Sequence, residues 1–451
     1  MTKYFQLINN NASNIFLFLI SFTFPLGIYF FPIQTPLLLI NGFHLVLYFS
    51  LIYLKVSKQI KLFIGKSTRY YLILLAVWLL YGFCGLLWAK EIKPVLQDMF
   101  GLINAIGILI ALQSLLVLNN FRIKPFIQGW FTALAVVGII GLLETETAYH
   151  LDKDWIAVIM KLPIGHSIRY VPIATFGNPN NYAVYLIFSL PLLLMLRNTT
   201  TAISAKWISL LCMLWIILLT QSRLGIFSFL LLLVISLFML KDIDIAFIKK
   251  QIHPLVNLYI PIILVALLII ALFNWPFLQH LSFSSYFYTN NNVANSDQTR
   301  VGLIQAGLEM FVASHGLGVG GGNFPYYINQ HLVSIDTYGS CNPHNWPIEV
   351  LSQYGIGIFT LLATFAIYII NQYIQLLNRF KNKGIFKFVT CGILLGIGYL
   401  IMSIDPSNFM RLPMNWILLS MIVTLVDCLH ENASEFYDQN NMPSHIGSPV
   451  Q

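Results

Sequence analysis

The sequence predicts an all-α polytopic membrane protein with about twelve transmembrane helices. Three observations support this fold class: 57% of the 451 residues are hydrophobic, only 9% are charged, and apolar runs of roughly 20 residues recur along the whole chain. No stretch has the mixed polarity of a soluble core. We therefore expect one transmembrane helical domain over residues 1–430, followed by a short cytoplasmic tail, 431–451, that is polar and disordered.

The predicted spans are apolar runs separated by charged breaks or by breaks rich in Gly, Pro and Asn. Prolines in the first run suit a bent first span better than a cleaved signal peptide, and no small-residue cleavage pattern follows that run. In chain order, the spans lie near residues 14–31, 37–54, 70–89, 100–118, 126–143, 181–196, 207–221, 224–240, 255–273, 346–372, 388–404 and 413–428.

The distribution of positive charge predicts the orientation of the chain. With the N-terminus inside, the inner loops and tails hold 17 of the 25 Lys and Arg residues, and the outer side keeps 8. The net charge of +8 therefore reflects membrane topology and gives no reason to expect nucleic acid binding. The five cysteines do not have the spacing of a disulfide framework or a zinc site.

Polar residues collect on the predicted outer side, in segments 144–180, 221–223 and 274–345, the last being a large loop between spans 9 and 10. Within this loop we expect an amphipathic helix over Thr299–Ala313 that lies on the membrane surface. Its predicted apolar face consists of Val301, Ile304, Leu308 and Phe311.

Five glycines follow this helix, between Gly316 and Gly322. Their backbone amides could bind phosphate oxygens. The alternative is a flexible reversal between two helices.

Two arginines of the outer segments have the chemistry to bind a diphosphate. Because a charge at the bilayer centre costs about 2.5–3.5 kcal/mol, we expect Arg223, in the hairpin TQSRLG, at the outer interface. Arg300 begins the predicted surface helix, where an ordinary exposed pair with Asp297 is the simpler interpretation. Two converging guanidinium groups would bind a diphosphate bidentately. The alternative for each arginine is contact with lipid headgroups.

His344 lies directly before a long apolar span. Pro347 suits the first turn of that helix, and Asn342 or Asn345 could cap it, which would place the imidazole at a helix N-terminus. The helix dipole disfavours imidazolium there, so a neutral His344 could take a proton from a sugar hydroxyl. The alternative is a histidine that only hydrogen-bonds to water or headgroups.

Glu349 lies further into the same span, where an ionisable residue is a functional candidate that either pairs with an arginine or orients an acceptor. A protonated, structural side chain is the alternative. The outer loop also holds acidic residues and four histidines, but their spacings are not a metal-binding pattern, so we expect no metal site.

Four segments, in this order, resemble the O-antigen ligase and O-antigen polymerase superfamily. They are FGNPNNYAVYL (Phe176–Leu186), QSRLGIF (Gln221–Phe227), TRVGLIQAGLEMF with its sequel GLGVGGGNF (Thr299–Phe324), and PHNWPIEVLSQYGIGIF (Pro343–Phe359). Each motif is short, but the four occur with matching sidedness. The resemblance covers residues 170–360 by motif and the whole chain by span layout.

This resemblance implies a GT-C-type glycosyltransferase of the bacterial inner membrane, multi-pass, with its active site facing the periplasm. Such enzymes transfer a glycan from undecaprenyl diphosphate and need no metal or other cofactor. In a ligase the acceptor is a sugar of the lipid A core, and in a polymerase it is another lipid-linked glycan. The resemblance assigns diphosphate binding to Arg223 and Arg300, and activation of the acceptor to His344.

The remaining candidate residues follow from the same resemblance. Asn178 and Asn180 match a shared motif with a structural or substrate-lining role, and Asn345 and Glu349 are possible acceptor or pocket residues. The chain departs from the common pattern at Gln353, where an acidic residue is frequent, while Glu349 lies one turn earlier.

We interpret the chain as an inverting, metal-independent O-antigen ligase, in contact with membrane lipids and with no nucleic acid partner. A surface polysaccharide polymerase with the same donor is the main alternative. A protein O-oligosaccharyltransferase and a lipid-linked glycan transporter are the others. The sequence shows no internal repeat and no paired broken helices with buried midplane charges, and both observations count against a transporter.

Overall fold

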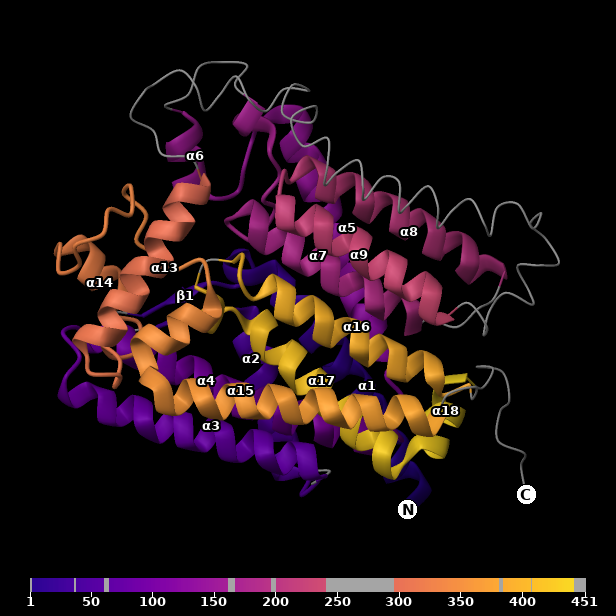
Figure 1. Cartoon of the computed structure of the whole chain (residues 1–451). Coiled ribbons are helices and arrows are strands. Elements are labelled where there is room, and N and C mark those ends of the chain that lie inside the picture. Colours follow the sequence, from indigo (N-terminus) through magenta and orange to yellow (C-terminus); the bar gives the residue numbers. More distant parts are fainter. Residues whose placement is uncertain are drawn as a thin grey trace.

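The computed structural model describes residues 2–35, 38–60, 65–160, 167–195, 200–240, 296–380, 384–406 and 408–441. These residues form a bundle of packed helices (Figure 1). Beside the helices lies a short antiparallel ribbon of β1 (Ile33–Gln34) and β2 (Leu39–Ile40), in which Ile33 pairs with Ile40.

The helices of the N-terminal half are α1 (Thr2–Thr23), η1 (Phe24–Tyr29), α2 (Gly42–Val56), α3 (Lys66–Cys84), η2 (Gly85–Leu87), α4 (Ile92–Leu118), α5 (Lys124–Thr147), α6 (Lys153–Ile159), η3 (Ser167–Tyr170) and α7 (Pro179–Met195). Those of the C-terminal half are α8 (Thr200–Leu219), α9 (Arg223–Leu240), α13 (Ser296–Ala313), α14 (Phe324–Asn329), α15 (Trp346–Phe380), α16 (Phe386–Met402), η5 (Phe409–Arg411), α17 (Pro413–Glu431) and α18 (Ala433–Asn441).

The predicted spans correspond to apolar helices wherever the structure describes them. Six helices are long and apolar enough to cross a membrane, judged by length and composition, and five shorter apolar helices match the other predicted runs. The predicted span at 255–273 lies outside the described residues. The described helices are those of a polytopic helical membrane protein.

Helix α17 lies at the centre of the bundle. It packs against α3, α4, α15 and α16, and 89% of its apolar window is buried. A helix that is apolar on all sides belongs in such a position. By contrast, α3 exposes large apolar side chains, including Ile73 and Leu80, which fits a face turned to lipid.

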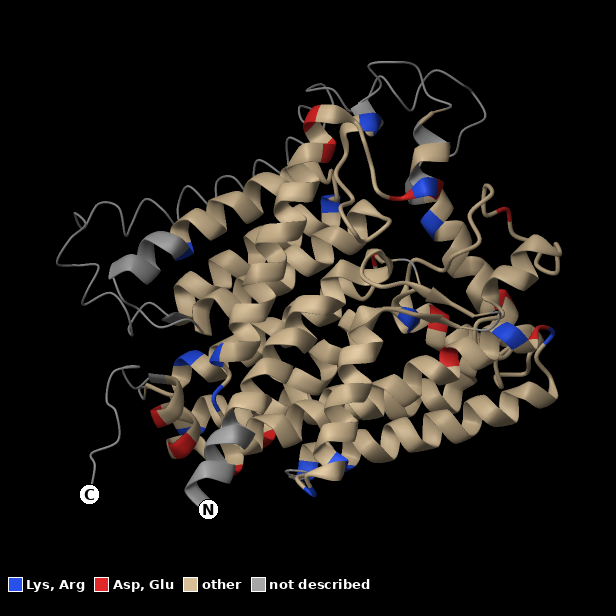
Figure 2. Ribbon diagram, turned by 180° about the vertical axis from the view of Figure 1, so that it is seen from behind, with Lys and Arg blue, Asp and Glu red and all other residues tan. Residues whose placement is uncertain are grey.

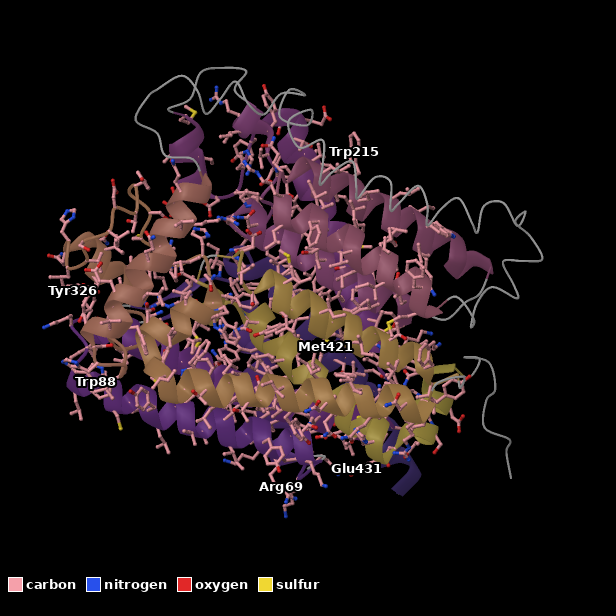
Figure 3. All side chains as sticks on the ribbon, viewed as in Figure 1. Arg69, Trp88, Trp215, Tyr326, Met421 and Glu431 are labelled. Atoms are coloured by element: carbon pink, nitrogen blue, oxygen red, sulfur yellow. The ribbon has the colours of Figure 1, made fainter. Side chains whose placement is uncertain are left out.

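Charged residues lie mostly toward the ends of the helices, and the middle of the bundle is largely uncharged (Figure 2). Arg69 and Glu431 lie at one end, and Trp88 and Tyr326 at the other (Figure 3). Contacts join the segments that we predicted to be on the outer side: Tyr29 donates to Asp152 (3.0 Å), and Trp88 donates to the Gly318 carbonyl (2.9 Å). We call the end that holds these segments the outer end, and the opposite one the inner end.

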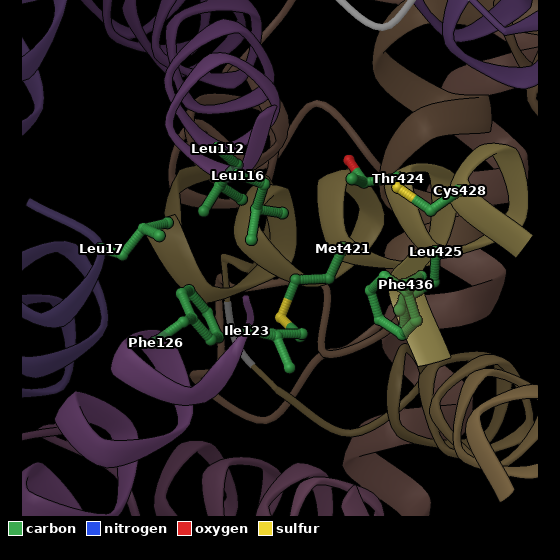
Figure 4. Close-up of a pocket in the computed structure, with 10 residues that line it drawn as sticks. All are labelled: Leu17, Leu112, Leu116, Ile123, Phe126, Met421, Thr424, Leu425, Cys428 and Phe436. Atoms are coloured by element: carbon green, nitrogen blue, oxygen red, sulfur yellow. The ribbon is translucent and has the colours of Figure 1, made fainter. Parts of the chain in front are cut away.

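The C-terminal tail differs from the prediction. We expected disorder from residue 431, but 433–441 form α18, which packs on α17 at the inner end. Phe436 is buried there and explains the docking, since it anchors an otherwise polar helix. A small apolar cavity of about 20 Å³ remains where α1, α4, α5, α17 and α18 meet (Figure 4).

Candidate active site

Asp405, in the loop after α16, contacts three segments of the outer end that are far apart in the sequence. Its side chain is 1% exposed and accepts hydrogen bonds from Arg300 Nη2 (2.6 Å) and Ser222 Oγ (3.1 Å). Its backbone oxygen lies 3.3 Å from His344 Nδ1. The structure therefore brings His344, Arg300 and the turn that contains Arg223 around one buried carboxylate.

His344 is held at the start of α15 as the sequence predicted. Asn345 caps the helix, because its Oδ1 accepts from Ile348 N (3.1 Å), which settles the choice between the two candidate caps. The Trp346 amide donates to the Ser403 carbonyl (2.9 Å), which ties the start of α15 to the end of α16. His344 itself has φ +45°, a strained conformation for a non-glycine residue that occurs often at functional sites.

The surroundings of His344 favour its neutral form. Burial lowers the pKa of the imidazole, and the Arg300 guanidinium lowers it further, while Asp405 acts in the opposite direction. When Nδ1–H donates to the Asp405 carbonyl, Nε2 is the unprotonated nitrogen. The geometry thus provides a neutral imidazole with one nitrogen available to accept a proton.

Arg300 extends from α13 and pairs with Asp405, 105 residues further along the chain, so its described ion pair is not the local one with Asp297 that we considered. The guanidinium is only partly covered, with a side-chain exposure of 34%. It can therefore pair with Asp405 and still present donors to a ligand at the same surface.

Helix α13 confirms the predicted helix and shows which face packs on the protein. Leu303 and Met310 are buried, and Gly307 lies against Ile348 of α15. The predicted apolar face points outward, with Val301 and Leu308 exposed. Contact of this face with the membrane surface stays a prediction.

Arg223 begins α9 and is exposed at the outer end of the α8–α9 hairpin. Gln221 makes the tight reversal with φ +58°, and Ser222 caps α9 by accepting from Gly225 N (3.1 Å). The Ser222 hydroxyl can donate to Asp405 while it accepts from the helix. It therefore ties the turn before Arg223 to the carboxylate that holds Arg300.

Asn178 and Asn180 lie at the start of α7, next to the start of α9. Asn178 caps α7 by accepting from Asn180 N (2.8 Å), which supports the structural part of the predicted role. The first turns of α7 and α9 touch closely, since a Cβ on Gly225 would come within 2.9 Å of Ala183. Both asparagines are half-buried at the rim near Arg223.

Glu349 has different neighbours from His344. It is buried with Gln353 as a hydrogen-bond partner and lies near Asp98 and Arg411. Of the two predicted roles, pairing with an arginine or orienting an acceptor, this placement favours the first, with Arg411 as the arginine. Arg411 Nε bonds to Asp98 (2.8 Å), and the Tyr354 hydroxyl donates to the same carboxylate (2.9 Å). This second cluster fills the space between α4, α15 and η5.

The glycine run after α13 is a packed connection between α13 and α14. The amides of Val319 and Gly320 donate to the carbonyls of Ser352 and Gln353 (2.9 and 3.0 Å), so they are not available to a phosphate. The docking partner is a kink in α15 at Gly355 (φ +72°). The predicted contact with a phosphate is therefore wrong for the Gly320 amide.

The close approach of the two segments explains the glycines. Gly318 has φ +84°, and a Cβ there would lie 2.6 Å from the backbone oxygen of Gln353. Neither a side chain at this position nor one at Gly355 would leave room for the contact.

Asp405 was not among the residues predicted for the site. The only local signal was an acidic residue directly after an apolar run, in the segment SIDPSNF. Among the described residues, no three His, Cys, Asp or Glu side chains are grouped so that they could hold a metal ion.

Comparisons with known proteins point to the same superfamily as the motifs. Residues 208–363 match the family model described as O-antigen ligase. The chain is 25% identical over 383 residues to the teichuronic acid biosynthesis protein TuaE of Bacillus subtilis (strain 168), covering 82% of this chain and 74% of that protein. Both findings confirm the resemblance to the O-antigen ligase superfamily. The range matched by the family model contains Arg223, Arg300 and His344 but not Asp405.

Proposed function

We propose that this polytopic protein of the O-antigen ligase superfamily transfers a glycan from undecaprenyl diphosphate to an acceptor sugar at the outer end of the bundle. The observation that carries the proposal is the meeting of Arg300, His344 and the Ser222–Arg223 turn at Asp405. In the bacterial inner membrane, with the N-terminus inside, this site faces the periplasm.

Arg223 and Arg300 bind the diphosphate of the donor in this proposal. Each is exposed enough to reach a ligand. Arg300 pairs with Asp405, and Arg223 follows Ser222, which donates to the same carboxylate. The Arg300 guanidinium pairs with Asp405 but stays partly exposed, so it can still donate to an anion. Preorganised cations stabilise the charge that grows on the leaving diphosphate, which is usually the largest contribution to catalysis.

His344 acts as the general base. Its Nε2 takes the proton from the acceptor hydroxyl, and the hydroxyl oxygen attacks the anomeric carbon from the face opposite the diphosphate. The new glycosidic bond forms as the carbon–oxygen bond to the diphosphate breaks, so the anomeric centre inverts and undecaprenyl diphosphate leaves. The lowered pKa of His344 keeps the base unprotonated near neutral pH. No step requires a metal ion.

The acceptor separates two candidate reactions. A ligase transfers the glycan to the lipid A core, in line with the description of the matched family model. A polymerase transfers it to another lipid-linked glycan. The name of the relative refers to teichuronic acid, a surface polysaccharide, and this observation favours the polymerase.

The reaction is tested with purified protein, an undecaprenyl diphosphate-linked glycan and candidate acceptors. We expect release of free undecaprenyl diphosphate only when an acceptor is present; a transporter would release none. His344→Asn should lose transfer, because asparagine tolerates the positive φ but cannot act as the base. His331→Asn is the matched control, since His331 is exposed and has φ +52°. Near-normal transfer by His344→Asn would exclude histidine as the base.

A deletion strain distinguishes the two acceptors. Loss of all O-antigen from the lipid A core, seen on a lipopolysaccharide gel, indicates a ligase. Core that carries a single repeat, or surface polysaccharide reduced to single units, indicates a polymerase.

A further inference from the structure

A groove between α1 and α5 at the inner end combines an apolar floor with two cations. It has a volume of about 420 Å³. Ile15, Phe18 and Leu19 of α1 form much of the floor, and Arg122 and Lys124 lie at the start of α5. Both cations are exposed.

The position of Arg122 is fixed by the C-terminal helix. Its Nε donates to Gln439 of α18 (2.8 Å). Asn440 holds the neighbouring backbone, because its side chain accepts from Ile123 N and donates to the Phe121 carbonyl (3.0 Å each). The guanidinium is thus presented at the mouth of the groove by side chains that were expected to be part of a disordered tail.

Two other grooves, of about 620 and 430 Å³, have no such cations among their lining residues. The groove between α1 and α2 is lined by Phe16, Phe49 and further apolar side chains, with Ser57 at its edge. The groove between α5 and α8 is lined by side chains such as Leu142 and Trp215. Those surfaces suit any acyl chain, whereas the α1–α5 groove adds a binding place for a negative headgroup.

We propose that the α1–α5 groove binds an anionic phospholipid of the inner leaflet, with an acyl chain on Phe18 and Leu19 and the phosphate between Arg122 and Lys124. A guanidinium and an ammonium at the edge of an apolar groove match the two parts of such a lipid. Each basic side chain near an anionic membrane surface contributes favourably to such binding. This site is independent of glycan transfer and lies at the end of the bundle opposite Asp405.

The test uses the full-length protein, stripped of lipid in detergent and titrated separately with palmitoyl-oleoyl phosphatidylglycerol and phosphatidylcholine. Native mass spectrometry measures how much of each lipid remains bound. Arg122→Gln/Lys124→Gln removes the headgroup contacts, and Gln128→Trp fills the groove without a change of charge. Lys66→Gln/Arg69→Gln removes two exposed cations from the inner end of α3, and Val46→Trp fills the α1–α2 groove.

We expect the unmodified protein to prefer phosphatidylglycerol. The double variant at α5 should bind it at least about tenfold more weakly, because it loses both charge-assisted contacts, and bind phosphatidylcholine as before. Gln128→Trp should weaken the binding of both lipids. Lys66→Gln/Arg69→Gln should match the unmodified protein, and Val46→Trp should keep its preference for phosphatidylglycerol. Equal binding of the two lipids, or equal losses in the α3 and α5 variants, would overturn the proposal. If the double variant does not fold, unchanged phosphatidylglycerol binding by Gln128→Trp would do the same.

Discussion

Two aspartate–arginine pairs flank the start of α15, and they differ in what surrounds them. In both pairs the aspartate is 1% exposed, and the arginine side chains are 34% exposed for Arg300 and 36% for Arg411. The distances are also similar, 2.6 Å to Asp405 and 2.8 Å to Asp98. Geometry of the pair alone therefore does not distinguish a binding site from a structural contact.

The neighbours of each pair distinguish them. Asp405 is joined by Ser222, by His344 and by Arg300, whose guanidinium stays partly exposed. Arg411 lies among Asp98, Glu349 and Tyr354, so negative and neutral groups already surround it. Gly322 closes over Arg411, because a Cβ at this glycine would come within 2.5 Å of its Nη2. We infer that the first pair serves ligand binding and the second one holds the fold.

The largest expected difference between the pairs is in activity. Arg300→Gln should lower the rate of glycan transfer by about 10²- to 10³-fold, the typical loss when one donor to a developing negative charge is removed. Arg411→Gln should leave the rate per folded molecule within a few fold of the unmodified protein. Purified variants assayed at equal folded concentration make this comparison. Equal losses in the two variants would remove the distinction between the pairs.

For stability, we expect the larger loss in Arg411→Gln and the smaller one in Arg300→Gln. Arg411→Gln leaves the buried Asp98 and Glu349 without their cation, and we expect a loss on the order of 2 kcal/mol, less than for a fully buried pair because the arginine is partly exposed. The drop in thermal unfolding temperature measures it. If Arg300→Gln destabilised the protein more than Arg411→Gln, the second pair would not be the structural one.

A substitution in the glycine run next to the Asp98–Arg411 pair should have a smaller effect on stability. Gly318→Ala should cost about 1–2 kcal/mol, because alanine is strained at φ +84° and its Cβ would meet the Gln353 carbonyl. Gly357→Ala, in α15 where nothing lies within 4 Å of the added Cβ, is the matched control and should be neutral or slightly stabilising. Equal unfolding temperatures for the two variants would contradict the close packing of this loop.

The pH dependence of transfer tests the contact between Arg300 and His344. Burial and Arg300 both lower the pKa of His344, so activity should persist below pH 6.5 and fall as the imidazole is protonated at lower pH. Arg300→Gln removes one lowering effect, and the acid limb of its residual activity should move to higher pH. Arg300→Lys keeps the charge and should leave the limb in place. A limb that is the same in all three proteins would argue against His344 as the titrating base.

The smallest expected effect is the pH dependence of stability that comes from His150, in the outer segment 144–180. Burial opposes protonation of His150, but its contacts with Glu144 and the Arg169 carbonyl outweigh burial and raise its pKa. A folded-state pKa above the unfolded one gives stability that is complete below the unfolded pKa and is lost as pH rises through the folded pKa. The unfolding temperature should therefore decline above pH 6.5 in the unmodified protein, and the decline should be weaker in His150→Gln. Parallel pH profiles would contradict the pairing.

Most of the fold could be predicted because each span carries its own signal. Long apolar runs and the charges between them do not depend on distant residues, and the described helices match the predicted runs. The signal for the capped start of α15 was also local, since His344, Asn345 and Pro347 lie close together in the sequence. The α18 helix was missed because its polar sequence carries a single anchoring side chain, Phe436.

The site could be predicted only in part. Arg223, Arg300 and His344 stood out in polar outer segments, but the contact that unites them is Asp405, which lies 105 residues from Arg300 and 183 from Ser222. Such a pairing leaves no periodic pattern in one sequence. The same holds for Glu349, whose neighbour Asp98 belongs to another helix. The glycine run was ambiguous for a similar reason, because its partner is the kink at Gly355.

A structure of the protein with undecaprenyl diphosphate bound tests the central claim most directly. The account predicts diphosphate oxygens at hydrogen-bonding distance, about 3 Å, from the guanidinium groups of Arg223 and Arg300, with His344 on the side that the sugar would occupy. A diphosphate bound at Arg411, or at a place from which His344 cannot reach the anomeric carbon, would contradict it.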